Sequence, residues 1–156
     1  MFSENLHARV LGEVPVRHMV FTLPKRFRRY FQYDRGLLSE IATAAWEAIR
    51  HVAGVALGPD HLPAAVLALY SASETLGWNP HAHLIVADGG FTQQDIFVRM
   101  SQWDESLLQK QFSSYLLTIL VERELMDSTT AQQILTQEHN GFSVRCERIV
   151  ESHDTE

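Results

Sequence analysis

The 156-residue sequence contains a single cysteine, Cys146, and no long apolar run. One cysteine excludes an internal disulfide and a cysteine-rich zinc site, which favours a reducing, cytoplasmic location. No apolar stretch reaches the roughly 18 residues needed to cross a bilayer, so no membrane partner is expected. The N-terminal segment MFSENLHARVLGE lacks the basic-then-apolar pattern of a secretory signal. The 46% of hydrophobic residues is instead typical of a globular domain with its own core.

Positive charge is also scarce. The chain has 13 lysines and arginines against 19 acidic residues, a formal net charge of −6. An acidic chain is an unusual nucleic-acid binder, but the basic residues are unevenly placed. Six of them fall between positions 17 and 35, where Asp34 is the only acid. The overall charge therefore excludes no class of partner.

The pattern of apolar residues predicts one α+β domain over residues 1–156. Apolar runs predict strands at 16–23, 63–73, 81–87 and 141–150, with an edge strand within 91–100. Helical spacing predicts helices over 34–52 and 104–126, and a shorter helix after Asp127 or Ser128. Short turns such as Asp88-Gly89-Gly90 imply antiparallel pairing, with helices covering the sheet. The ends, 1–14 and 151–156, are expected to be flexible.

The segment NPHAHLIV places two histidines, His81 and His83, at the start of a predicted strand. Side chains two residues apart on a strand point to the same face, so the two imidazoles would lie side by side while Ala82 faces away. Two neutral ring nitrogens can bind one metal ion if a further ligand is present. An oxygen ligand would suit Mg²⁺ or Mn²⁺.

Glu74 is the first candidate for the third ligand, because the turn TLGWNP could bring it back beside the pair. Asp88 and His18 are weaker candidates. The alternative is structural: many such pairs are exposed histidines at the start of a strand, and Glu74 would then be a solvated loop carboxylate. The sequence leaves both interpretations open.

The basic and aromatic segment KRFRRYFQYDR, residues 25–35, is the second notable feature. Its cations could neutralise phosphates, and its aromatic rings could stack on unpaired bases. The DNA-binding candidates are Lys25, Arg26, Arg28 and Arg29, and the stacking candidates are Phe27, Tyr30, Phe31 and Tyr33. The alternative is a surface turn whose aromatic residues face the core.

Three blocks, HMVFTLPKRFRRYFQYDRGLLSEI, TLGWNPHAHLIVADGGF and HNGFSV, together resemble a known bacterial family. This family is the rolling-circle insertion-sequence transposases, the two-tyrosine group of HUH (His-hydrophobe-His) nucleases, and the resemblance covers nearly the whole chain. It implies a ferredoxin-like, RRM-like palm with the histidine pair on a central strand. It further implies that His81 and His83 hold a divalent ion and that a tyrosine attacks a phosphate of single-stranded or hairpin DNA. Glu74 matches a third ligand of some related nucleases.

The chain also departs from this family. It has no cysteine-rich zinc segment before residue 15, and it carries Asn79 where the family often has histidine. The family's tyrosine motif, which follows the H-x-G-F-S-V strand, does not occur before Glu156. We therefore expect a truncated palm domain that lacks its nucleophile. A missing C-terminal segment or a second chain would supply the tyrosine.

The tyrosines within the chain do not stand in the family's motif. Tyr115 lies in line with the apolar stripe of a predicted helix, so we expect it to pack rather than to attack phosphate. Tyr70, Tyr30 and Tyr33 are expected to be structural or to contact DNA. The chain by itself is therefore expected not to cut.

Three other functions fit parts of the sequence. A non-catalytic remnant would bind single-stranded DNA through the basic segment without forming a covalent link. A cupin-like metal enzyme also combines H-x-H with a carboxylate, here Asp88, but it needs many short strands, whereas two long helical patterns occupy much of this chain. A repurposed structural protein would keep the fold and bind no metal.

Overall fold

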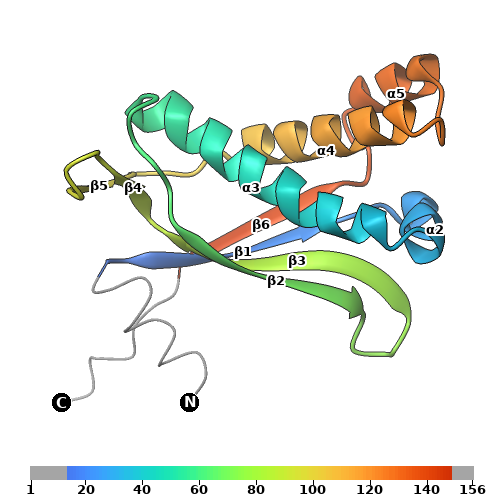
Figure 1. Cartoon of the computed structure of the whole chain (residues 1–156), viewed down its shortest axis with the longest axis horizontal. Coiled ribbons are helices and arrows are strands. Elements are labelled where there is room, and N and C mark those ends of the chain that lie inside the picture. Colours follow the sequence, from blue (N-terminus) through green and yellow to red (C-terminus); the bar gives the residue numbers. More distant parts are fainter. Residues whose placement is uncertain (1–13, 149–156) are drawn as a thin grey trace.

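The computed structural model describes residues 14–148. These residues form a four-stranded antiparallel sheet with helices packed over one face (Figure 1). The strands lie in the spatial order β2-β3-β1-β6. Their bounds are Val16–Thr22 (β1), Ala65–Ala72 (β2), Trp78–Ala87 (β3) and Ser143–Arg148 (β6). The ends predicted to be flexible, 1–14 and 151–156, lie outside the described residues except for Val14.

Two long helices cover the sheet and pack against each other (Figure 1). The helix α3 (Gly36–Leu57) connects β1 to β2, and α4 (Glu105–Glu122) lies between β3 and β6 in the chain. Because β3 is inserted between β1 and β2, the chain follows the split βαβ arrangement of ferredoxin-like folds. The predicted α+β fold, an antiparallel sheet covered by helices, is confirmed.

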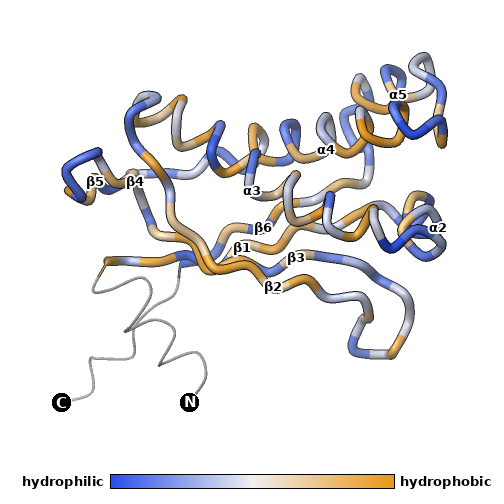
Figure 2. The backbone as a smooth tube through the Cα atoms, in the orientation of Figure 1, coloured by the Kyte–Doolittle hydropathy of each residue, from blue (hydrophilic) through white to orange (hydrophobic). Residues whose placement is uncertain are grey.

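The core lies between the helices and one face of the sheet. Alternate residues of the central strands, such as Phe21 and Leu84, point into it, and Phe21 meets Phe112 of α4 edge to face at 5.1 Å between ring centroids. In Figure 2 the tube alternates between hydrophobic and hydrophilic colours along α4, as an amphipathic helix requires. The helix α3 buries the stripe that its spacing predicted: Leu37, Ile41, Ala44, Ala45, Ala48, Ile49 and Val52.

The last two helices begin where the sequence predicted, and each has an acidic residue as its N-terminal cap. The Asp104 carboxylate accepts a hydrogen bond from the backbone N–H of Leu107 at 3.0 Å. Asp127 accepts one from the N–H of Thr130 at 2.8 Å and begins α5 (Ser128–Leu135). Each cap satisfies a backbone donor that has no partner within its helix.

The basic segment forms a helix, α2 (Lys25–Tyr33), which the apolar spacing did not predict. Phe27 and Phe31, one turn apart, are both buried in the core. Of the two interpretations that the sequence left open, these two rings follow the second: they face the core and are not available to stack on bases. Only these two residues of the nine-residue helix are buried, and the five basic and polar residues among its aromatic positions obscure the helical period.

Gly89 and Gly90 do not form the predicted turn. They belong to β4 (Gly89–Phe91), which pairs with β5 (Phe97–Arg99) in a separate two-stranded sheet. A Cβ atom at Gly89 would lie 2.0 Å from the carbonyl oxygen of Val98, so only glycine fits. None of the helices within residues 14–148 is long and apolar enough to span a bilayer.

Candidate active site on the open face of the sheet

The two histidines of the H-x-H motif lie near the middle of the sheet, on its open face. On β3, His81 is directly opposite Tyr70 of β2 and Thr22 of β1. Directly opposed residues share a face of an antiparallel sheet. Ala82, which lies between the two histidines, is buried under the helices, so the histidines point to the face that no helix covers (Figure 1).

The imidazole rings are close together, as the spacing predicted. The ring centroids of His81 and His83 are 4.8 Å apart. A third histidine, His18 of β1, places its Nε2 atom 2.9 Å from Nδ1 of His83 and stacks on that ring. Tyr70 completes the group, with its ring centroid 5.5 Å from that of His81 and 4.9 Å from that of His83.

The hydrogen bonds of these rings determine which nitrogens remain available. Nδ1 of His81 lies 2.7 Å from the backbone carbonyl oxygen of Asn79. Because a carbonyl only accepts, Nδ1 carries the hydrogen and Nε2 of the neutral ring keeps its lone pair. In His83, a donor role for Nδ1 toward His18 leaves Nε2 free in the same way. Metal-binding histidines commonly have this arrangement, in which the second nitrogen is bonded to a polar neighbour.

His83 is biased toward the neutral form that metal binding requires. Burial lowers its pKa below the ordinary histidine value, and the neighbouring His81 and His18 rings lower the pKa further. The imidazole therefore offers a lone pair at neutral pH.

The third ligand predicted at Glu74 is not assembled with the pair. Glu74 is exposed in the turn between β2 and β3, and it lines the same open cavity of about 690 Å³ as Tyr70, His81 and His83. Within residues 14–148, no three histidine, cysteine or acidic side chains converge closely enough to hold a metal ion.

Asn79, which replaces a histidine that is frequent in the resembled family, offers another oxygen. It lines the same cavity, and its Oδ1 atom is buried without a hydrogen-bond partner. A buried acceptor without a partner is costly, so a cation or a donor at this position would relieve the cost. The residue series i, i+2, i+4 formed by Asn79, His81 and His83 is the sequence signal for this arrangement.

Asp88, a weaker candidate ligand, lies elsewhere. It follows the far end of β3, is 1% exposed, and accepts hydrogen bonds from the Arg17 guanidinium and from Nε1 of Trp103. This carboxylate is therefore committed to a buried ion pair. With the α+β fold, its placement removes the cupin-like interpretation, which needed Asp88 beside the histidines.

The basic helix α2 lies at the histidine end of β3. Nε1 of Trp78, the first residue of β3, donates to the backbone carbonyl of Arg28 at 2.8 Å. Lys25, Arg26 and Arg29 are exposed, whereas Arg28 is half-buried. Arg26 is partly engaged within the protein, since its NH2 group donates to the Asn140 carbonyl at 3.0 Å. Lys25 and Arg29 are thus the freest of the four predicted DNA-binding cations.

Tyr115 lies in the helix layer, behind the sheet as seen from the histidines. Its hydroxyl donates to the Glu40 carboxylate at 3.2 Å. Burial raises the pKa of this hydroxyl, and the Glu40 charge raises the pKa further, which disfavours the phenolate. This placement separates Tyr115 from the histidine pair.

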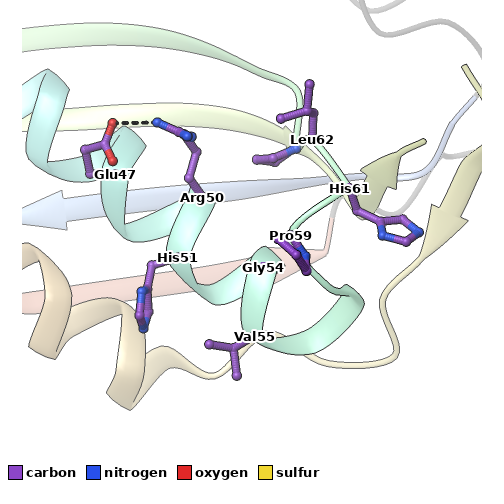
Figure 3. Close-up of a pocket in the computed structure, with 9 residues that line it drawn as sticks. Glu47, Arg50, His51, Gly54, Val55, Pro59, His61 and Leu62 are labelled. Carbon is purple, nitrogen blue, oxygen red and sulfur yellow. Dashed lines mark hydrogen bonds and ion pairs between the residues drawn. The ribbon is translucent and has the colours of Figure 1, made fainter. Parts of the chain in front are cut away.

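A second cavity, of about 390 Å³, lies near the end of α3 (Figure 3). Its lining includes an ion pair between Glu47 and Arg50, with 3.1 Å between the charged atoms. His51 and His61 also line it, but Figure 3 shows them on different sides of the cavity rather than converging. The arrangement provides no cluster of ligands or nucleophiles.

Known proteins that are similar to this chain are transposases, in agreement with the family that the sequence motifs resemble. A protein-family model described as "Putative transposase" (Y2_Tnp) matches residues 65–156, which include β2, β3 and the histidine pair. The transposase for insertion sequence element IS801 of Pseudomonas savastanoi pv. phaseolicola is 31% identical over 103 residues. That match covers 64% of this chain but 24% of the relative, so the chain spans about a quarter of the relative's length. No solved structure matches significantly.

Proposed function

Because this chain belongs to the transposase family whose model matches residues 65–156, we propose that it forms the DNA-nicking palm of an insertion-sequence transposase. The open face of the sheet would bind single-stranded or hairpin DNA and present one phosphate beside His81 and His83. The observation that carries this function is the histidine pair itself, two adjacent imidazoles on the open face of a central strand.

The residues present fit a Mg²⁺ or Mn²⁺ ion. Nε2 of His81 and Nε2 of His83 would be two ligands, and an oxygen of Asn79 or Glu74 would be the third. When bound, the ion would supply Lewis-acid polarisation of the phosphate. The chain's own contribution is to hold the neutral imidazoles in place, through the Asn79 carbonyl for His81 and through His18 for His83.

The basic face of α2 would hold the DNA backbone. Lys25 and Arg29 would bind phosphates directly, and Arg26 and Arg28 would add to the positive field next to the start of β3. This contact is independent of base sequence. It fixes the register of the strand over the histidines.

The nucleophile in this proposal is a tyrosine hydroxyl. It loses its proton, its oxygen bonds to phosphorus, and the 3′ oxygen leaves and is protonated, which gives a 5′-phosphotyrosine and a free 3′-hydroxyl. Tyr115 is too far removed, behind the sheet and hydrogen-bonded to Glu40. All four tyrosines of the 156 residues lie within 14–148, so the nucleophile is proposed to come from a polypeptide segment other than these residues, such as a second chain.

Two measurements on the same protein test this function. Mn²⁺ titration by calorimetry should give binding that is lost in the His81→Ala, His83→Ala double variant. Labelled single-stranded oligonucleotides should bind in native gels, and more tightly with Mn²⁺ than with EDTA. An absence of both metal binding and DNA binding would contradict the proposal.

A non-catalytic, single-strand-binding remnant is the second candidate, because none of the chain's four tyrosines stands in the family's motif. It predicts DNA binding that is indifferent to Mn²⁺ and to loss of the two histidines. A denaturing gel separates a third case. A DNA-dependent shift that survives denaturation would show that a tyrosine of this chain attacks, and would refute an external nucleophile.

A further inference from the structure

We propose that Tyr70 is a positioning residue that stacks on an unpaired base and so places the adjoining phosphate over the histidine pair. This inference rests on the proposed function, because it names how the same open face holds single-stranded DNA. Tyr70 lies on β2, directly opposite His81, and its side chain points to the face that no helix covers.

The ring is exposed where an apolar group would normally be covered. Tyr70 is 51% exposed, although it lies on a paired strand beside a central one. It contributes nothing to the apolar core under the helices. A large aromatic ring left half in water on a sheet face is a typical platform for a nucleic-acid base, since every base has a face that can stack.

The surroundings leave room for a flat ligand. Ala68, two residues before Tyr70 on the same face of β2, is small and exposed, and Ala72 lines the same cavity as Tyr70. The ring itself is held by its neighbours, with interplanar angles of 23° to His81 and 66° to His83. A pre-oriented ring loses little conformational entropy when a base stacks on it.

The charges around the site favour an extended nucleic acid over an apolar partner. The cationic face of α2 adjoins the start of β3, so a strand crossing it reaches Tyr70 and the histidines next. Glu74 lines the same cavity and repels phosphate, so the nearest phosphate would lie on the side of the histidines. Because a base and its phosphate belong to one nucleotide, a base on Tyr70 brings its phosphate near His83, whose ring centroid is 4.9 Å away.

Fluorescence anisotropy with a short labelled oligothymidine, in EDTA so that no metal contributes, tests the stack. Tyr70→Ala should weaken binding by about fivefold to 100-fold, the range for loss of one base–aromatic stack. Tyr70→Phe should bind as the wild type, because the ring face is kept. Leu69→Ala, the neighbouring change on the opposite face of β2, is the matched control and should leave affinity unchanged. Tyr70→Leu, which keeps apolar bulk without a flat ring, should behave like Tyr70→Ala.

The outcomes separate this inference from the function on which it rests. If the wild type binds DNA and responds to Mn²⁺ while Tyr70→Ala binds equally well, the stack is refuted and the proposed function stands. If the wild type binds no single-stranded DNA, both fail. A covalent DNA adduct that forms with the wild type but not with Tyr70→Phe would overturn the positioning role and make Tyr70 the nucleophile.

Discussion

His18 and His83, which are 65 residues apart in the sequence, meet across adjacent strands with 2.9 Å between Nε2 and Nδ1. β1 and β2 flank β3 on opposite edges, so His18 contacts His83 from one side and Tyr70 contacts it from the other. The hydrogen bond to His18 fixes the orientation of the His83 ring. In the proposed metal site, His18 would therefore support His83 and would not be a third ligand. Metal binding through Nε2 of His83 requires that Nδ1–H of His83 donates a hydrogen bond and that Nε2 of His18 accepts it, with both rings neutral.

Removal of this support should weaken the metal site without abolishing it. We expect His18→Ala to lower Mn²⁺ affinity by about 10- to 100-fold, the usual effect of losing an outer hydrogen-bond partner. His81→Ala and His83→Ala should each lose binding almost completely. Calorimetry measures all three, with His51→Ala, an exposed histidine of the helix layer, as the control. Equal losses in His18→Ala and His81→Ala would instead make His18 a direct ligand.

The third ligand can be assigned by charge. Asn79 has a buried, unpartnered oxygen, whereas Glu74 is exposed, so we favour Asn79. Asn79→Asp should tighten Mn²⁺ binding because a carboxylate adds a full negative charge, and Asn79→Ala should weaken it about tenfold or more. Glu74→Gln should have little effect. Strong weakening in Glu74→Gln, with an unchanged Asn79→Ala, would restore the ligand that the sequence first indicated.

The sequence predicts those features of the site that depend on neighbouring residues and not those that depend on distant ones. The alternation of side chains along a strand depends only on neighbouring residues, so the sequence alone places His81 and His83 on one face. The spacing of apolar residues that predicts the long helices is also a local pattern. The burial of Asn79 Oδ1 and the His18 contact depend on how β1, β2 and β3 align, which no single segment encodes. Asp88 was a plausible ligand until its partner Arg17, 71 residues away, was located.

The basic helix should contribute to DNA binding through charge alone. The double variant Lys25→Glu, Arg29→Glu should weaken binding of single-stranded DNA equally for all base sequences. The slope of the logarithm of the binding constant against the logarithm of the salt concentration should become shallower by about 0.7 per lost phosphate contact. Lys110→Glu, at an exposed lysine of α4, makes the same charge change as Lys25→Glu alone and is the control for that single variant. Affinity measured over a salt series decides the matter. An equal loss in Lys110→Glu would indicate a general charge effect instead of a binding face.

The Arg17–Asp88 ion pair should contribute to stability and not to the site. Asp88→Ala leaves a buried guanidinium without its carboxylate and leaves Trp103 Nε1 without an acceptor. We expect the free energy of unfolding, measured in urea, to fall by about 3–5 kcal/mol. Asp60→Ala, at an exposed loop position, should stay within about 0.5 kcal/mol of the wild type. A variant that folds but loses Mn²⁺ binding would contradict the separation of the two sites.

The lone thiol reports on the packing of β6 through its pH dependence. Burial raises the pKa of Cys146; the Arg17 guanidinium opposes this shift without offsetting it, and Glu105 and Asp88 raise the pKa further. Only the thiolate is alkylated, so a raised pKa lowers the reactive fraction at every pH below the midpoint. The iodoacetamide rate of the folded protein should therefore rise with a midpoint above about 8.5, the value of a free cysteine. In concentrated urea the burial is lost and the midpoint should fall to that value. Identical profiles in the two conditions would show that the Cys146 side chain is solvated in the native protein and that β6 is not packed there.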